Sequence, residues 1–126
     1  MISTLSLVAL GGAIGASLRF LTGVLVLRTV GPQDFPLAVI TVNILGSFLM
    51  GAFVVLAAQR GLTHLGPFMM TGILGGFTTF SAFSLETVTL VERGALGAAA
   101  AYVTVSVAGS IAALAVGIWI ARGLLA

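Results

Sequence analysis

The chain has 126 residues, of which 60% are hydrophobic and only 6% carry a charge, and its mean hydropathy is +1.27. No soluble class of protein has this composition, so lipid is the solvent for most of the chain. The five basic residues exceed the three acidic ones by only two charges, which argues against a nucleic-acid partner. Because the chain contains no cysteine, disulfides, thiolate nucleophiles and cysteine metal sites are excluded.

Hydropathy along the chain predicts an all-α membrane protein with four transmembrane helices, at roughly 2–27, 36–58, 66–91 and 95–121. A spanning helix takes roughly 20 apolar residues, so four spans use most of the sequence. We therefore expect short connections, the first at 28–34, and a single transmembrane domain over 1–126. The first apolar run exceeds a signal-peptide core and has no basic start, so we expect it to remain in the protein.

The third span contains a segment that favours helix only weakly. Gly72, Gly75 and Gly76 precede Thr78 and Thr79. Each glycine lowers helix stability by about 1 kcal/mol relative to alanine, and unwound backbone is tolerated in a membrane only where protein or a water-filled cavity surrounds it. We therefore predict a broken helix, interrupted near 75–79. The alternative is that Gly72 and Gly76 simply let two helices pack closely.

The arginines are divided almost evenly between the two ends of the spans. If the N-terminus faced the cytoplasm, Arg60 and Arg122 would lie on that side, and Arg28 and Arg93 on the other. Arginine bias normally decides how a membrane protein inserts, and this balance leaves the orientation undecided. The sequence therefore predicts an antiparallel, dual-topology homodimer.

Polar side chains inside the spans are candidates for function, because hydrocarbon offers them no hydrogen-bond partners. Asn43 in the second span can both donate and accept hydrogen bonds, and it could also serve only to tie two helices together. In the fourth span Tyr102, Ser106 and Ser110 recur every four residues and form one polar stripe, for which contact between helices is the alternative. Arg19 in the first span could pair with a carboxylate or stand at an aqueous vestibule and concentrate anions.

The second half of the third span combines two aromatic rings with several polar groups. Phe80 and Phe83 share one helix face, and their polar neighbours are Thr79, Ser81, Ser84 and Glu86. The edge of a phenyl ring is positive, so rings flanked by hydroxyl donors could hold a partly dehydrated anion, although plain packing explains the same spacing. Glu86 could couple transport to protons, or it could lie near the membrane interface and bond to threonines such as Thr87 or Thr89.

Four motifs resemble those of the Fluc, or CrcB-type, fluoride channels of bacteria and archaea, and the resemblance covers essentially the whole chain. They are Gly11-Gly12-x-x-Gly15-x-x-x-Arg19, Thr41-Val42-Asn43-x-x-Gly46, Gly75-Gly76-Phe77-Thr78-Thr79-Phe80-Ser81-x-Phe83-Ser84-x-Glu86 and Tyr102-x-x-x-Ser106-x-x-Gly109-Ser110. The third motif is highly specific. One departure is Ala38-Val39-Ile40, where the family commonly has a small hydroxyl residue, so one polar position of the pore wall is missing.

The resemblance implies a passive fluoride-selective channel without enzymatic activity. Such a protein exports cytoplasmic fluoride across a prokaryotic plasma membrane, through two pores in each dual-topology dimer. Phe80 and Phe83 would line the pores, Asn43 would donate to fluoride, and Arg19 would stand at the vestibule. Further polar contacts would come from Tyr102, Ser106 and Ser110.

The same resemblance implies one central, structural sodium ion. The backbone carbonyls of Gly75 and Thr78 from both subunits would hold it. Unwound carbonyls are free acceptors suited to a hard cation, so such a cage needs no carboxylate.

Two other functions compete with the channel. A small proton-coupled multidrug-type exporter shares the four spans, the length and the dual topology, but it needs a carboxylate in its first span. The first span here contains only Arg19, which has the wrong sign for a cationic substrate. A structural subunit, whose polar residues only join helices, is the other alternative.

Overall fold

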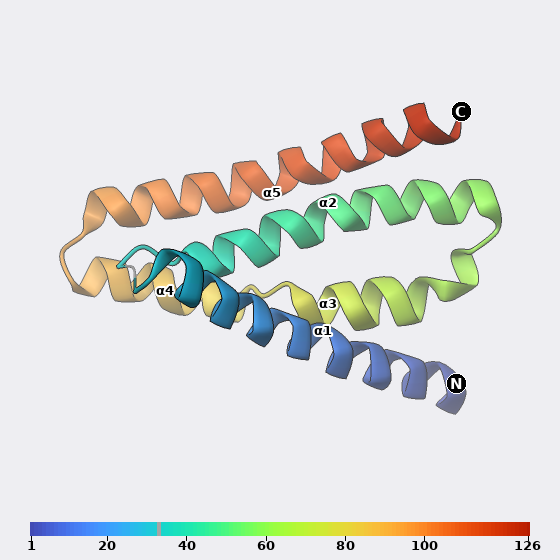
Figure 1. The fold of residues 1–126 in the computed structure, drawn as a ribbon, viewed down its shortest axis with the longest axis horizontal. Helices are drawn as coiled ribbons and strands as arrows, with labels where there is room; N and C mark the ends of the chain where they lie inside the picture. Colours follow the sequence, from blue (N-terminus) through green and yellow to red (C-terminus); the bar gives the residue numbers. More distant parts are fainter. Residues whose placement is uncertain (33) are drawn as a thin grey trace.

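The computed structural model describes residues 1–32 and 34–126, and its secondary structure there is helical throughout (Figure 1). Four helices in this part of the chain are long and apolar enough to cross a membrane. In chain order the elements are α1 (Ile2–Val30), α2 (Leu37–Arg60), η1 (Thr63–Leu65), η2 (Pro67–Leu74), α3 (Gly75–Phe77), α4 (Ser81–Glu92) and α5 (Leu96–Leu125). The prediction of an all-helical protein with four membrane-spanning helices is confirmed.

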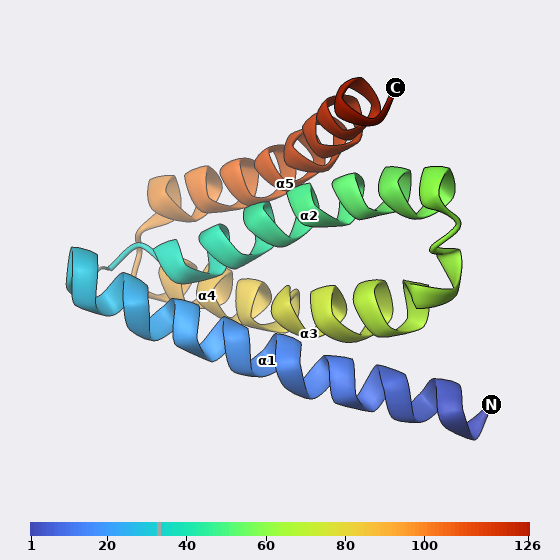
Figure 2. The same cartoon turned by 45° about the vertical axis from the view of Figure 1, so that its right-hand side comes forward.

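The spans run alternately in opposite directions, so both termini lie at the same end of the bundle (Figures 1 and 2). α2 packs along α5, α1 packs against η2 and α3, and α4 packs against α5. The third span, made of η1, η2, α3 and α4, therefore contacts all the other spans. α3, in the middle of the third span, is in contact with both α1 and α2.

Two helices extend beyond their predicted ends. α1 continues through residues 28–30, which the prediction placed in a turn, and it ends only at Gly31, whose N–H group donates to the Leu27 carbonyl. Gly31 has a φ of 83°, which glycine adopts without strain. α5 continues to Leu125 instead of ending at 121, since no proline or positive-φ residue interrupts it. Of the predicted turn, Gln33 lies outside the described residues.

Glycines bring α1 onto the backbone of the third span. A Cβ atom added at Gly72 would lie 2.9 Å from the Gly11 Cα, and one at Gly76 would lie 2.7 Å from the Gly12 carbonyl oxygen. A Cβ at Gly15 would collide with the Ile73 carbonyl. Since only glycine permits such approach, close helix packing at Gly72 and Gly76 is an observed feature of this fold.

The third span changes conformation twice along its length. Pro67–Leu74 forms a π-helix, a wider coil that is usually confined to single turns, and α3 follows it. Helical structure then stops, because Thr78 is extended, with φ −86° and ψ 160°, and α4 begins at Ser81. The paired glycines are thus helical, and the non-helical residues are 78–80. The reason lies in the Thr79 N–H group, which donates to the side chain of Asn43 instead of to a preceding carbonyl.

Candidate functional site

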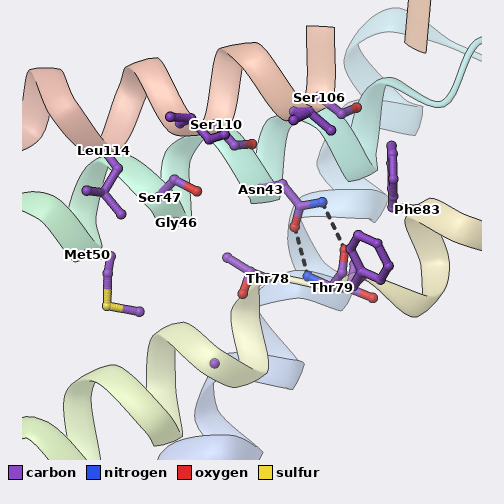
Figure 3. A pocket seen from close by; sticks show the side chains of 14 residues that line it. Asn43, Gly46, Ser47, Met50, Thr78, Thr79, Phe83, Ser106, Ser110 and Leu114 are labelled. Carbon is purple, nitrogen blue, oxygen red and sulfur yellow. Dashed lines mark hydrogen bonds between the residues drawn. The ribbon is translucent and has the colours of Figure 1, made fainter. Parts of the chain in front are cut away.

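A groove of about 440 Å³ lies beside the non-helical residues 78–80 (Figure 3). Its walls come from α2, from α5 and from the third span. The groove brings together most of the residues that the sequence singled out, namely Asn43, Gly75, Thr78, Thr79, Phe80, Phe83, Ser106 and Ser110. It is therefore the candidate functional site.

The Asn43 side chain holds the backbone of Thr79 through two hydrogen bonds. Its Nδ2 donates to the Thr79 carbonyl across 2.9 Å, and the Thr79 N–H donates to its Oδ1 across 2.8 Å (Figure 3). Gly46, one turn along α2, allows this approach, because a Cβ there would overlap the Thr78 methyl group. Asn43 thus ties two helices together, which was one of its two predicted roles. An amide nitrogen carries two N–H groups, so one donor remains for a ligand.

The Thr79 hydroxyl connects the non-helical residues to α4. It accepts a hydrogen bond from the Ala82 N–H across 3.1 Å and lies 3.4 Å from the Ser81 Oγ. This contact satisfies one of the N–H groups that a helix start leaves without an intrahelical partner. Thr79 is therefore held at its backbone N–H and carbonyl by α2 and at its side chain by α4.

Aromatic rings form a chain that starts at the groove. The centroids of Phe80 and Phe83 lie 5.4 Å apart, those of Phe83 and Tyr102 5.2 Å apart, and those of Tyr102 and Phe35 5.7 Å apart. Phe83 is buried at 8% exposure, whereas Phe80 is 76% exposed. The two phenylalanines that the spacing pairs on one face thus occupy different environments. Phe35, which sequence reasoning missed, gave only the weak signal of an aromatic residue beside a predicted span.

Two residues of the Ala38-Val39-Ile40 departure pack against this aromatic chain. Val39 and Ile40 are partly buried against the cluster that contains Phe83, Leu90 and Tyr102. At these positions the chain therefore supplies apolar packing around the aromatic rings and not a hydroxyl group.

Two hydroxyl groups on α5 are buried without any hydrogen-bond partner. Tyr102 is 0% exposed and Ser106 is 4% exposed, and neither hydroxyl has a partner among the described residues. Leaving a buried hydroxyl unsatisfied costs about 1–3 kcal/mol, so a ligand or water that accepts from these groups would be bound favourably. Ser106 lines the groove and Ser110 follows it one turn later, whereas Tyr102 reaches the groove through its contact with Phe83.

Arg19 does not line the groove. Its Nε donates to the Gly76 carbonyl across 3.1 Å, and its side chain is half-buried. The hollow that it does line contains only residues of α1, namely Ala16, Phe20, Gly23, Val24 and Leu27. The structure thus pairs Arg19 with a carbonyl group, where the sequence suggested a carboxylate or a vestibule.

The remaining polar candidates of α4 also lie outside the groove lining. The Ser84 hydroxyl donates to the Phe80 carbonyl across 3.0 Å. Bonds from Glu86 to Thr87 or Thr89, one of the two alternatives for this residue, are absent from the described residues, because each threonine donates to the carbonyl four residues earlier, as hydroxyls in helices commonly do. Glu86 itself is half-buried.

Comparison with known proteins identifies the family. Residues 6–118 match the family model described as CrcB-like protein, Camphor Resistance (CrcB). The chain belongs to the CrcB family. The resemblance that the motifs indicated is thereby confirmed.

Several relatives of this CrcB chain carry the name "Fluoride-specific ion channel FluC". The protein of Ruegeria sp. (strain TM1040) is 69% identical over 125 residues, which is 99% of each chain. That of Roseobacter denitrificans (strain ATCC 33942 / OCh 114) is 64% identical over 95% of this chain and 96% of its own. That of Cereibacter sphaeroides (strain ATCC 17029 / ATH 2.4.9) is 57% identical over the full length of both. Ion channels conduct and do not catalyse, so the prediction of no enzymatic activity is confirmed.

The Asn43 contact generates the first prediction. Replacing Asn43 with leucine (Asn43→Leu) keeps a similar volume but removes both hydrogen bonds to Thr79. We expect hydrogen–deuterium exchange of the Thr79 amide to accelerate and the free energy of unfolding in detergent to fall by about 1–3 kcal/mol. Ser47→Ala is the matched control, because Ser47 lines the same groove without a hydrogen bond to the non-helical residues. Equal exchange rates of the Thr79 amide in the two variants would contradict the role of Asn43 in holding the Thr79 backbone.

Proposed function

We propose that this CrcB protein is a passive fluoride-selective channel that exports cytoplasmic fluoride across a prokaryotic plasma membrane. The observation that carries the proposal is the groove, whose lining includes a buried serine hydroxyl with no partner in the described residues, the Asn43 amide and two phenyl rings. The names of the relatives, at 57–69% identity, support the choice of anion.

The chemistry of the groove suits a small anion that must keep moving. Hydroxyl and amide donors replace part of the hydration shell of an anion, and the positive edges of phenyl rings add weak attraction. No arginine lines the groove. Conduction requires binding that is weak enough for release, and a groove of neutral donors meets this condition.

A passive pore is sufficient for export. Hydrogen fluoride is a weak acid that enters cells as a neutral molecule and ionises inside, where the anion is trapped. A membrane pore selective for the anion releases it down its electrochemical gradient. Such a pore relieves fluoride toxicity without an energy source.

The proton-coupled multidrug-type exporter is not favoured. α1 contains no carboxylate in its sequence, and its central charge, Arg19, is bonded to a backbone carbonyl. Movement of a lipophilic cation against a proton gradient, with no movement of fluoride, would reverse this preference.

The central prediction concerns Phe80. In liposomes loaded with fluoride, addition of a potassium ionophore should release fluoride rapidly through the wild-type protein and release little chloride. We expect Phe80→Ile to slow fluoride release about tenfold or more, equivalent to about 1.4 kcal/mol on the transport barrier, because the ring edge is lost. A fluoride electrode measures both rates.

Leu49→Ala serves as the control for this experiment. Leu49 is an exposed residue of α2 that does not line the groove, so fluoride release should remain close to that of the wild type. Equal rates for all three proteins would support a structural subunit and remove the pore assignment.

We further propose that the channel is an antiparallel, dual-topology homodimer with two pores. Arg28 and Arg93 lie at the C-terminal ends of α1 and α4, and Arg60 and Arg122 lie at the C-terminal ends of α2 and α5. The ends of α1 and α4 are opposite the chain termini, whereas the ends of α2 and α5 are on the same side as the termini (Figure 1). This balance gives no orientation preference. Phe80 and Gly75, at the groove, are exposed on a single chain, and an inverted second copy would cover them and complete the pore wall.

Dual topology is testable by labelling, since the chain has no cysteine of its own. With Ala126→Cys, a membrane-impermeant maleimide applied to intact cells should label about half of the molecules, because both orientations are equally populated. Complete labelling or none would contradict dual topology.

We also propose that the non-helical residues break the third span within the membrane and help to hold a structural sodium ion. Gly75 and Thr78 line the groove, and in the described residues neither carbonyl oxygen accepts a hydrogen bond from a side chain. Free carbonyls are suitable ligands for a hard cation, and two copies of the chain would supply four. The ion would contribute a buried positive charge that favours an anion nearby.

The sodium proposal predicts a dependence on the cation in the buffer. Prolonged replacement of sodium by N-methylglucamine, which is too large for a carbonyl cage, should slow fluoride release from the liposomes, and restored sodium should recover it. The fluoride electrode again provides the measurement. Release that is unchanged after exhaustive replacement would count against the carbonyl cage.

A further inference from the structure

One face of α1 carries two glycines and then an arginine at intervals of four residues. Gly11, Gly15 and Arg19 share this face. A Cβ at Gly11 would lie 2.9 Å from the Gly72 Cα, and one at Gly15 would lie 2.8 Å from the Phe77 backbone nitrogen. The glycines therefore press α1 onto the third span. The next turn of the same face places Arg19 over the end of α3.

The partner of Arg19 is a carbonyl group that the interruption releases. In a continuous α-helix, the Gly76 carbonyl would accept a hydrogen bond from the Phe80 N–H group. Since α3 ends at Phe77 and α4 begins at Ser81, this bond is missing, and the Arg19 Nε donates to the Gly76 oxygen across 3.1 Å instead. The contact joins residues that are 57 positions apart in the sequence.

The surroundings of Arg19 favour this role over the concentration of anions. Charged residues within a membrane pair with one another or with backbone carbonyls. In residues 1–32 and 34–126, the Gly76 carbonyl is the one hydrogen-bond partner of the Arg19 side chain. Arg19 does not line the groove that contains Asn43 and Phe80.

We propose that Arg19 is a positioning residue, whose guanidinium group holds the Gly76 carbonyl and so sets the path of the interrupted backbone. α1 then holds the chain at Gly76, and α2 holds it at Thr79 through Asn43. Between these two points lies Thr78, which lines the groove. If the Arg19 contact is lost, the backbone between Gly76 and Thr79 is free to change direction beside the groove.

The sequence offers a selective spectroscopic test of this contact. Gly76–Phe77 is the only glycine–phenylalanine pair in the chain, so ¹³C-carbonyl glycine combined with ¹⁵N phenylalanine gives a single carbonyl–nitrogen correlation. In Arg19→Met the Gly76 carbonyl resonance should move upfield, because the oxygen loses its hydrogen bond. Arg122→Met, the same substitution at the end of α5, is the matched control and should leave the resonance in place. An unchanged resonance in Arg19→Met would overturn the proposal.

A second measurement uses the wild-type protein and does not depend on the folding of a variant. With ¹⁵Nε arginine added to the same labelling, magnetisation transfer between an arginine Nε and the Gly76 carbonyl should be observed in proteoliposomes. Its absence would overturn the contact. Arg19→Lys should restore part of the carbonyl shift, since an ammonium group also donates but lacks the directed guanidinium fork.

Fluoride release then separates positioning from anion concentration, and this readout alone rests on the proposed channel function. We expect Arg19→Met to lower the maximal release rate about tenfold, even at saturating fluoride, as for the loss of one charge-assisted hydrogen bond. A loss that disappears at high fluoride would overturn the positioning role and favour a vestibule. If the wild type releases no fluoride, the channel function fails, while the carbonyl resonance still tests the Arg19 contact.

Discussion

Backbone polar groups inside a membrane must find partners within the protein, because lipid offers none. The rest of this structure depends on the partners that other helices give to the backbone of the third span around residues 78–80, which are not helical. Asn43 from α2 bonds to both backbone polar groups of Thr79, its N–H and its carbonyl, and Arg19 from α1 bonds to the Gly76 carbonyl. Both side chains reach the backbone because glycines remove the Cβ atoms that would keep the helices apart.

The same arrangement explains the character of the groove. Asn43 bonds to the N–H and carbonyl of Thr79, and Arg19 bonds to the Gly76 carbonyl, so the free donors come from the neighbouring walls, chiefly the buried Ser106 hydroxyl and the second N–H of Asn43. Arg19 lies outside the groove lining, and its guanidinium group donates to the Gly76 carbonyl. The groove therefore presents neutral donors and ring edges, and no arginine is part of its lining.

Hydropathy predicted the spans because length and apolarity are local properties of the sequence. Weak helix formation near the paired glycines was also visible locally, yet the non-helical residues begin only at Thr78. The glycines lie in α3, whereas the Thr79 N–H donates to the Asn43 side chain instead of to a preceding carbonyl. Helical spacing paired Phe80 with Phe83, but it could not show that the aromatic chain continues through Tyr102 to Phe35, because these residues come from three separate segments.

The sequence by itself determined the membrane environment, the four spans and the family, since composition, hydropathy and short motifs carry that information directly. It also singled out Asn43, Phe80, Phe83, Ser106 and Ser110, because polar and aromatic groups at these spacings are unusual in lipid. Only the tertiary structure decided which partners they have. It paired Asn43 with Thr79 and Arg19 with Gly76, and it left the Ser106 hydroxyl unpaired. These pairings join residues far apart in the chain, and their geometry depends on helix packing that no local pattern records.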